Sequence, residues 1–135
     1  WVIQERGGWR RVSEPVQAEI HRKAYEQGLK MVEEWATRFP KQGRVWTYAA
    51  QMCIVKTSVI YGNSDFETAL KFYERAMLCE NAPWFAFLAY ANITRMQVPA
   101  QKTRSRAFLE ARLAGAHFQQ KIAVINDALE ILNAE

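Results

Sequence analysis

Residues that interrupt helices are scarce in this chain. Its 135 residues include six glycines and four prolines, few for a protein built from short strands and tight turns. Residues with high helix propensity, from Ala and Leu to Glu, Lys, Gln, Arg and Met, are plentiful. Half of the residues are apolar, which is enough to bury a core in one domain. We therefore expect an all-α fold.

Cysteines and long apolar runs are also scarce. If Cys53 and Cys79 lie on antiparallel helices joined near residues 62–63, they are offset by about 10 Å along the helix axis, too far for a disulfide. We expect two buried, reduced thiols, which leaves the compartment open between cytoplasm and periplasm. No apolar run approaches the ~18 residues that span a bilayer, so we expect no membrane insertion by this segment.

Charge of one sign does not form long blocks. The net charge is +4, and the 18 basic and 14 acidic residues are interspersed along most of the chain. Two basic runs with a nearby aromatic, RGGWRR at 6–11 and KTRSR at 102–106, could follow a phosphate backbone. The scattered acidic residues nevertheless disfavour a nucleic-acid partner.

Apolar residues recur at intervals of three or four between the breaking residues, and this pattern predicts about six helices. Pro15 in the first turn and Pro40 at the end bound the first helix. Ser64 with Glu67 predicts a capping box at the third helix, and Asn81 is the expected cap of the fourth. The expected helices cover residues 13–40, 45–62, 64–77, 81–99, 107–114 and 118–133.

The same spacing predicts which residues face the core. We assign three tryptophans to it, Trp35, Trp46 and Trp84. In the third helix the expected inner face holds Phe66, Ala69, Leu70, Tyr73, Ala76 and Met77. In the fifth it holds Ala107, Ala111 and Ala114, and in the sixth Ile122, Ile125, Leu129 and Leu132.

A spacing of 38 residues recurs along the chain. Three pairs share it: Trp46 and Trp84, Ala69 and Ala107, and Ala76 and Ala114. The pairs come from both members of a helix pair, which favours a repeating hairpin, although a closed bundle could show the same period.

Phe66, Ala69, Tyr73 and Ala76 resemble the second helix of the tetratricopeptide repeat, and the segment FYERA with a helix-opening tryptophan is similar to the related half-a-TPR type. The resemblance implies a right-handed stack of antiparallel helical hairpins, an α-solenoid fragment spanning 13–135 and ending in a cap helix at 118–133. Residues 1–12 are then a flexible arm or a linker remnant.

The resemblance also implies a function and a site. Such stacks present a concave groove, so we expect a non-catalytic module that binds a protein or peptide. The family's groove positions correspond here to Arg44, Thr47, Gln51, Phe85, Ala89 and Asn92.

Signatures of catalysis are absent from the sequence. Neither His21 nor His117 has a second metal ligand three or four residues away, and Ser58 and Ser105 lie in no nucleophile motif. We expect no enzyme activity, no metal and no cofactor in this fragment.

Two alternatives keep the fold and change the function. The abrupt apolar start, WVI without a methionine, leads us to expect that the chain was cut from a longer parent. It could be the periplasmic regulatory tail of a membrane-bound bacterial glycan polymerase or O-antigen ligase-like enzyme. Enzymes of these kinds carry similar helical-repeat tails on the periplasmic side. An RNA-processing scaffold of the half-a-TPR type is the second alternative.

Overall fold

The computed structural model describes the backbone of residues 2–5, 8–11, 14–55 and 65–134, and the side chains of 19–20, 22–54 and 65–134. From Glu14 onward the described chain is all helical, as predicted. Its α-helices are α1 (Glu14–Arg38), α2 (Gly43–Val55), α3 (Phe66–Leu78), α4 (Trp84–Gln97), α5 (Lys102–Ala114) and α6 (Gln119–Asn133), with a 3₁₀ turn at Pro99–Gln101.

The first residues form a β-hairpin. Strands β1 (Val2–Glu5) and β2 (Gly8–Arg11) pair antiparallel, with Val2 opposite Arg11 and Glu5 opposite Gly8. The expectation of an arm at 1–12 did not include these strands. Valine, isoleucine and tryptophan favour extended backbone, which accounts for a hairpin in so short a segment.

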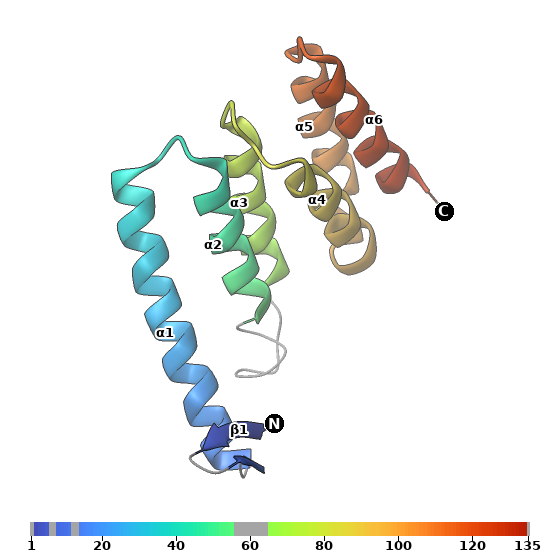
Figure 1. Ribbon diagram of the computed structural model, residues 1–135. Helices are drawn as coiled ribbons and strands as arrows, with labels where there is room; N and C mark the ends of the chain where they lie inside the picture. Colours follow the sequence, from blue (N-terminus) through green and yellow to red (C-terminus); the bar gives the residue numbers. More distant parts are fainter. Residues whose placement is uncertain (1, 6–7, 12–13, 56–64, 135) are drawn as a thin grey trace.

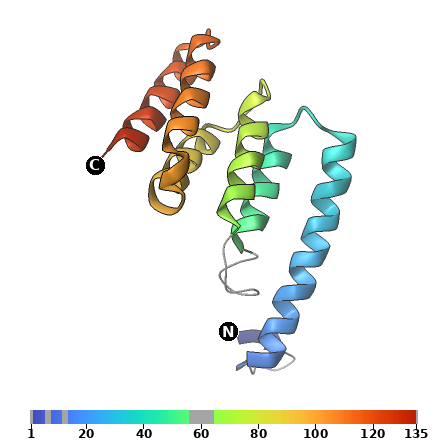
Figure 2. The same ribbon diagram turned by 180° about the vertical axis from the view of Figure 1, so that it is seen from behind.

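The helices pack in chain order at first and then skip one. Helix α1 lies along α2, and α2 packs on α3 (Figures 1 and 2). Helix α4 packs on α3 and more extensively on α6, which α5 also covers. The α1–α2, α3–α4 and α5–α6 turns all lie at one end of the molecule, uppermost in Figure 1. The hairpin lies at the other end.

The core runs from α2 to α6. Most of the inner face predicted for α3 is confirmed: Phe66 is half-buried, and the buried residues are Ala69, Leu70, Tyr73, Ala76 and Met77. In α6 the predicted residues Ile125 and Leu132 are fully buried, as is Ala128, while Ile122 and Leu129 are half-buried. Because α3 contacts both α2 and α4, it joins the two halves of the helical part.

The 38-residue spacing does not predict burial in its second copy. Trp46 is 8% exposed, whereas Trp84 is 63% exposed, so the assignment of Trp84 to the core was wrong. Trp35 is half-buried. Residue 84 is the first of α4, whose buried side chains lie deeper in the helix, at Ala86, Phe87 and Tyr90.

The inner face of α5 also differs from the prediction. Ala107, Ala111 and Ala114 are exposed, and the buried residues are Ser105 and Leu109. Burying a leucine removes more apolar surface from water than burying an alanine. The helix therefore packs with Leu109 inward, although the sequence spacing predicts the alanines there.

Two helix starts depart from their predicted caps. The N-cap of α3 is Asp65, whose carboxylate accepts a hydrogen bond from the backbone N–H of Thr68. Ser64, the predicted cap, lies outside the described residues, as does the predicted end of the second helix near Gly62. Asn81 does not cap α4, which begins after Pro83 without a side-chain cap.

Two glycines lie where neighbouring segments of the chain come so close together that a Cβ would meet them. A Cβ on Gly28 would lie 2.8 Å from Cε of Met52, where α1 meets α2. A Cβ on Gly43 would lie 2.8 Å from Cα of Ala82, in the turn before α4. The second approach is to backbone, which has less freedom to move than the end of a methionine side chain.

Cys53 and Cys79 are not joined by a disulfide, as predicted. Cys53 is half-buried and Cys79 is buried. The Cys79 thiol lies 3.4 Å from the carbonyl oxygen of Arg75, to which it donates, and burial raises its pKa against the opposing effect of the Arg75 charge. Among the described helices, none combines the length and the apolar character that crossing a membrane requires.

Candidate functional site

Three of the predicted groove residues are available at the surface. Arg44 and Gln51 are exposed on α2, and Asn92 is exposed on α4.

The other three predicted groove residues are buried or half-buried. Thr47 is 1% exposed, and its hydroxyl donates to the carbonyl oxygen of Gly43 at 3.0 Å. Ala89 packs against the core, and half-buried Phe85 meets the ring of Trp84 edge-on at 5.8 Å. None of the six predicted residues lines either of the two large hollows described next.

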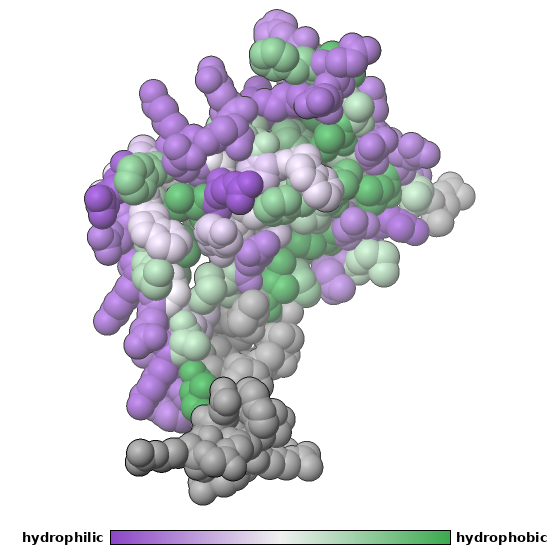
Figure 3. Space-filling model, in the orientation of Figure 1, coloured by the Kyte–Doolittle hydropathy of each residue, from purple (hydrophilic) through white to green (hydrophobic). Residues whose placement is uncertain are grey.

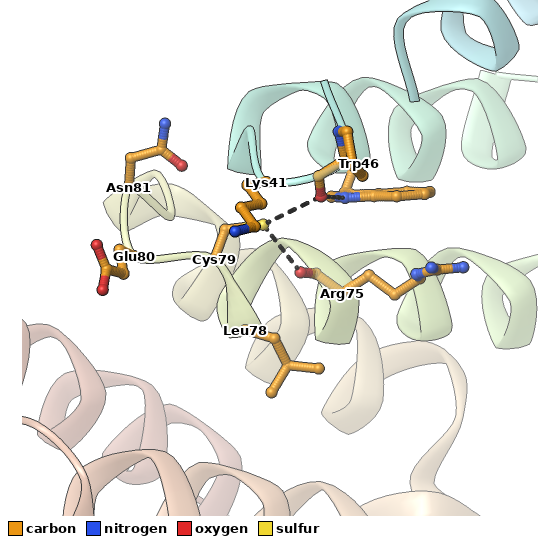
Figure 4. A pocket seen from close by; sticks show the side chains of 8 residues that line it. Lys41, Trp46, Arg75, Leu78, Cys79, Glu80 and Asn81 are labelled. Atoms are coloured by element: carbon orange, nitrogen blue, oxygen red, sulfur yellow. Dashed lines mark hydrogen bonds between the residues drawn. The ribbon is translucent and has the colours of Figure 1, made fainter. Parts of the chain in front are cut away.

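The first hollow lies beside the end of α3 and has a volume of about 640 Å³ (Figure 4). Lys41 comes from the α1–α2 turn, Trp46 from α2, and Arg75 and Leu78 from the last turn of α3. Pro40, Cys79, Glu80 and Asn81 complete its lining.

The second hollow, of about 830 Å³, lies between the α3–α4 turn and the α5–α6 turn. Its lining includes Trp84 at the start of α4 and Phe118 just before α6. Arg112 and Lys121 add positive charge to it.

Both hollows share Leu78, Cys79 and Glu80 in their linings, so they flank one turn. We call the two hollows together the turn groove. Large apolar side chains stand in water around it: Leu78 is 58% exposed, Trp84 63% and Phe118 76%. A gathering of large exposed apolar residues beside concave surface is typical of an interaction site.

Hydrogen bonds between the turns hold the groove in shape. The backbone N–H of Gly43 donates to Oδ1 of Asn81 at 3.0 Å, and Nδ2 of Asn81 donates to Oε1 of Gln42 at 2.6 Å. On the other side, Nζ of Lys121 donates to the carbonyl oxygen of Glu80 at 3.3 Å. The α3–α4 turn is therefore bonded to the start of α2 on one side and to the first turn of α6 on the other.

Arg75 is held over an aromatic ring. Its guanidinium lies 4.1 Å from the ring centroid of Trp46, and Figure 4 shows the two side chains next to each other. The indole is itself fixed, because Nε1 donates to the carbonyl oxygen of Pro40 at 2.8 Å and the ring stacks on Phe72. An exposed contact of this kind contributes about 0.5–1 kcal/mol. Arg75 is thereby oriented while it remains exposed to solvent.

A separate polar cluster joins α3, α4 and α5. The hydroxyl of Tyr90 donates to Oε2 of Glu74 at 2.7 Å, and Arg104 pairs with Oε1 of the same carboxylate at 2.9 Å. Thr94 and Ser105 share a hydrogen bond of 2.9 Å. Burial raises the pKa of Tyr90 well above its usual value. Neither hollow of the turn groove is lined by these residues, so the cluster joins helices and does not face a ligand site.

Residues 104–106 of the basic run at 102–106 make contacts within the protein. Arg104 is paired with Glu74, Ser105 is buried, and Nε of Arg106 donates to Asn133. The run therefore does not present a free basic strip. In the other run, residues 8–11 belong to β2, and residues 6–7 lie outside the described ones.

In the described part of the chain, the residues that could act in catalysis or bind a metal do not lie together. His117 is exposed in the α5–α6 turn, while Ser58 and the side chain of His21 lie outside the described residues. In the part that is described, no three His, Cys, Asp or Glu residues gather in a way that could hold a metal ion.

The sequence did not reveal the turn groove for an identifiable reason. The first ten residues of α4, WFAFLAYANI, include a single polar residue, so periodicity could not distinguish its exposed side from its buried side. The position of Trp84 directly after a proline, at a helix start, was the available signal. Leu78 and Phe118 likewise lie at the boundaries of α3 and α6.

Comparisons of the chain with family models, curated proteins and solved structures found no match.

Proposed function

We propose that this chain is a non-catalytic module that binds a protein or peptide segment through the turn groove. The observation that carries the proposal is the arrangement of Leu78, Trp84 and Phe118, exposed apolar side chains from three elements around two linked hollows. Tryptophan is among the residues that dominate binding energy in protein interfaces, where it fills a desolvated pocket.

The proposal places the hairpins in a stack similar to tetratricopeptide repeats. The packing of consecutive helices, α2 on α3 and α5 on α6, supports a succession of hairpins. The match of Phe66, Ala69, Tyr73 and Ala76 to the repeat supports it as well. In this reading the partner contacts the turns at the edge of the stack, instead of the helix faces to which Arg44 and Gln51 belong.

The test begins with peptides selected on the intact chain from a random library. The dissociation constant of a selected peptide is then measured for the wild type, for Trp84→Ser and for Leu78→Ser. We expect each variant to bind at least about tenfold more weakly, a loss of ~1.4 kcal/mol in binding free energy. Thermal unfolding should change little, because both side chains are exposed.

The matched control is the double variant Gln51→Ala/Asn92→Ala, at exposed residues of α2 and α4 that line neither hollow. It should bind the selected peptides as the wild type does and unfold at nearly the same temperature. If the control loses binding while Trp84→Ser retains it, the site is the helix face and not the turn groove. If selection yields no peptide that binds more tightly than about 1 mM, the proposed module is refuted.

A further inference from the structure

The fold gathers positive charge that the sequence spreads out. Three segments meet at the turn groove, residues 38–44, 75–84 and 112–121, and they contain a single acidic residue, Glu80. Their six basic residues are Arg38, Lys41, Arg44, Arg75, Arg112 and Lys121. Because the whole chain carries +4, the remaining residues have a net charge of −1. Figure 3 shows hydrophilic side chains along this upper end of the molecule.

Most of this charge is not neutralised by neighbouring carboxylates. Of the six basic residues, Arg38 has an ion pair among the described side chains, with Glu34 at 3.4 Å. Arg75 is oriented by the Trp46 ring instead, and Lys121 by a backbone carbonyl. Both of these contacts leave the positive charge in place.

The charges lie on both sides of the exposed apolar residues. Lys41 and Arg75 line the first hollow, Arg112 and Lys121 line the second, and Leu78 lies between them. A bound segment would therefore meet positive charge on either side of a central apolar contact. Facing potentials of opposite sign raise the association rate and select among partners.

We propose that the turn groove selects an acidic peptide segment that carries large apolar residues among its carboxylates. This inference rests on the proposed function and specifies the chemistry of its partner. The apolar residues contact Leu78, Trp84 and Phe118, and the carboxylates lie toward Lys41 and Arg75 on one side and Arg112 and Lys121 on the other.

Glu80 favours a peptide over a nucleic acid. It lines both hollows, between the two basic groups. A nucleic acid carries a phosphate at every nucleotide and would bring negative charge to Glu80. A peptide can place a neutral residue there.

The test compares three synthetic peptides of equal length, each with one leucine and one tryptophan at the same two positions. The remaining positions are all Glu in the first peptide, all Gln in the second and all Lys in the third. At about 50 mM salt the intact chain should bind the Glu peptide at least tenfold more tightly than the Gln peptide and bind the Lys peptide least. At about 500 mM salt the difference between Glu and Gln peptides should largely disappear, because exposed charges are screened.

Charge-reversal variants locate the effect. Lys41→Glu/Lys121→Glu should lose at least about tenfold in affinity for the Glu peptide, and Lys41→Glu alone should lose part of it without removing the Lys121 hydrogen bond. The control Lys30→Glu/Lys71→Glu makes the same change in net charge at exposed residues of α1 and α3 and should bind as the wild type does.

The failures of the two proposals are distinguishable. If Gln and Glu peptides bind equally well and both depend on Trp84, the acidic preference is wrong and the peptide-binding function stands. If no anchored peptide binds, both are wrong. If a single-stranded RNA binds more tightly than the Glu peptide, and the Lys41→Glu/Lys121→Glu variant abolishes that binding, the groove recognises nucleic acid instead.

Discussion

The backbone N–H of Gly43 donates a hydrogen bond of 3.0 Å to Oδ1 of Asn81, a residue 38 positions further along the chain. The spacing equals the period found in the sequence, and the bond joins the first residue of α2 to the turn before α4. Asn81 was predicted to cap α4. It connects two turns instead, which is a tertiary role that local sequence does not disclose.

Replacing Asn81 with alanine tests this connection. The change leaves the partly buried N–H of Gly43 without its acceptor, so we expect the free energy of unfolding to fall by about 1–3 kcal/mol. Urea denaturation measures the loss. Asn92→Ala, at an exposed position on α4, should change stability by no more than about 0.5 kcal/mol. Equal effects of the two variants would show that the turns are not joined through Asn81.

The two close-packed glycines should respond differently to an added methyl group. Gly43→Ala forces apart the α2 start and the backbone of Ala82, so we expect a loss of about 1–3 kcal/mol. In Gly28→Ala the methyl group meets the flexible end of Met52, and the gain of about 0.5–1 kcal/mol in helix propensity offsets the repacking. Thermal unfolding of both variants should therefore place Gly43→Ala well below Gly28→Ala. The reverse order would contradict the approach of the two turns.

The orientation of α5 can be checked at one buried and one exposed residue. Leu109 is fully buried, so Leu109→Ala should cost about 2–5 kcal/mol of unfolding free energy. Ala107→Ser, on the side that spacing had assigned to the core, should change stability by about 0.5 kcal/mol or less. Chemical denaturation distinguishes the two. A severe loss in Ala107→Ser would restore the repeat-based assignment.

The titration of Tyr90 makes the free energy of unfolding depend on pH in the alkaline range. Burial first, and then Glu74, raise the pKa of Tyr90 above its ordinary value of 10.0. The folded chain therefore keeps the phenolic proton in a range where the unfolded chain loses it, so this contribution is complete below about pH 10 and declines as the pH rises further.

We expect Tyr90→Phe to flatten the decline in unfolding free energy above about pH 10, and to cost about 0.5–1.5 kcal/mol at neutral pH through the lost hydrogen bond to Glu74. Denaturation at a series of pH values from neutral to alkaline measures both effects. Tyr48→Phe, at an exposed residue of α2, is the control and should keep the wild-type slope. Identical slopes in the two variants would refute the role of Tyr90. Tyr73, whose pKa burial also raises, accounts for part of any slope that remains.

Local pattern predicted the number and order of the helices, although α5 begins at Lys102, five residues before its predicted start. The all-α class, the start of α1 to within one residue and most of the inner face of α3 follow from propensity, breaking residues and spacing. These features depend on neighbours three or four residues away, which a linear chain displays directly.

Features set by packing between helices could not be read in the same way. Trp84 shares its spacing with Trp46 but lies at the start of α4, beyond the covered part of that helix. The charge at the turn groove looked dispersed because Lys41, Arg75 and Lys121 are far apart in the chain, and only the meeting of three turns brings them together. The groove positions taken from the repeat family include Thr47, which is buried here.

The lining of the turn groove comes from segments that span residue 40 to residue 124. During synthesis, the first hollow can form once α3 and its turn have left the ribosome, but the second has no far wall until α6 follows. A partner that needs both hollows would therefore bind only after α6 has been synthesised and has packed on α4 and α5.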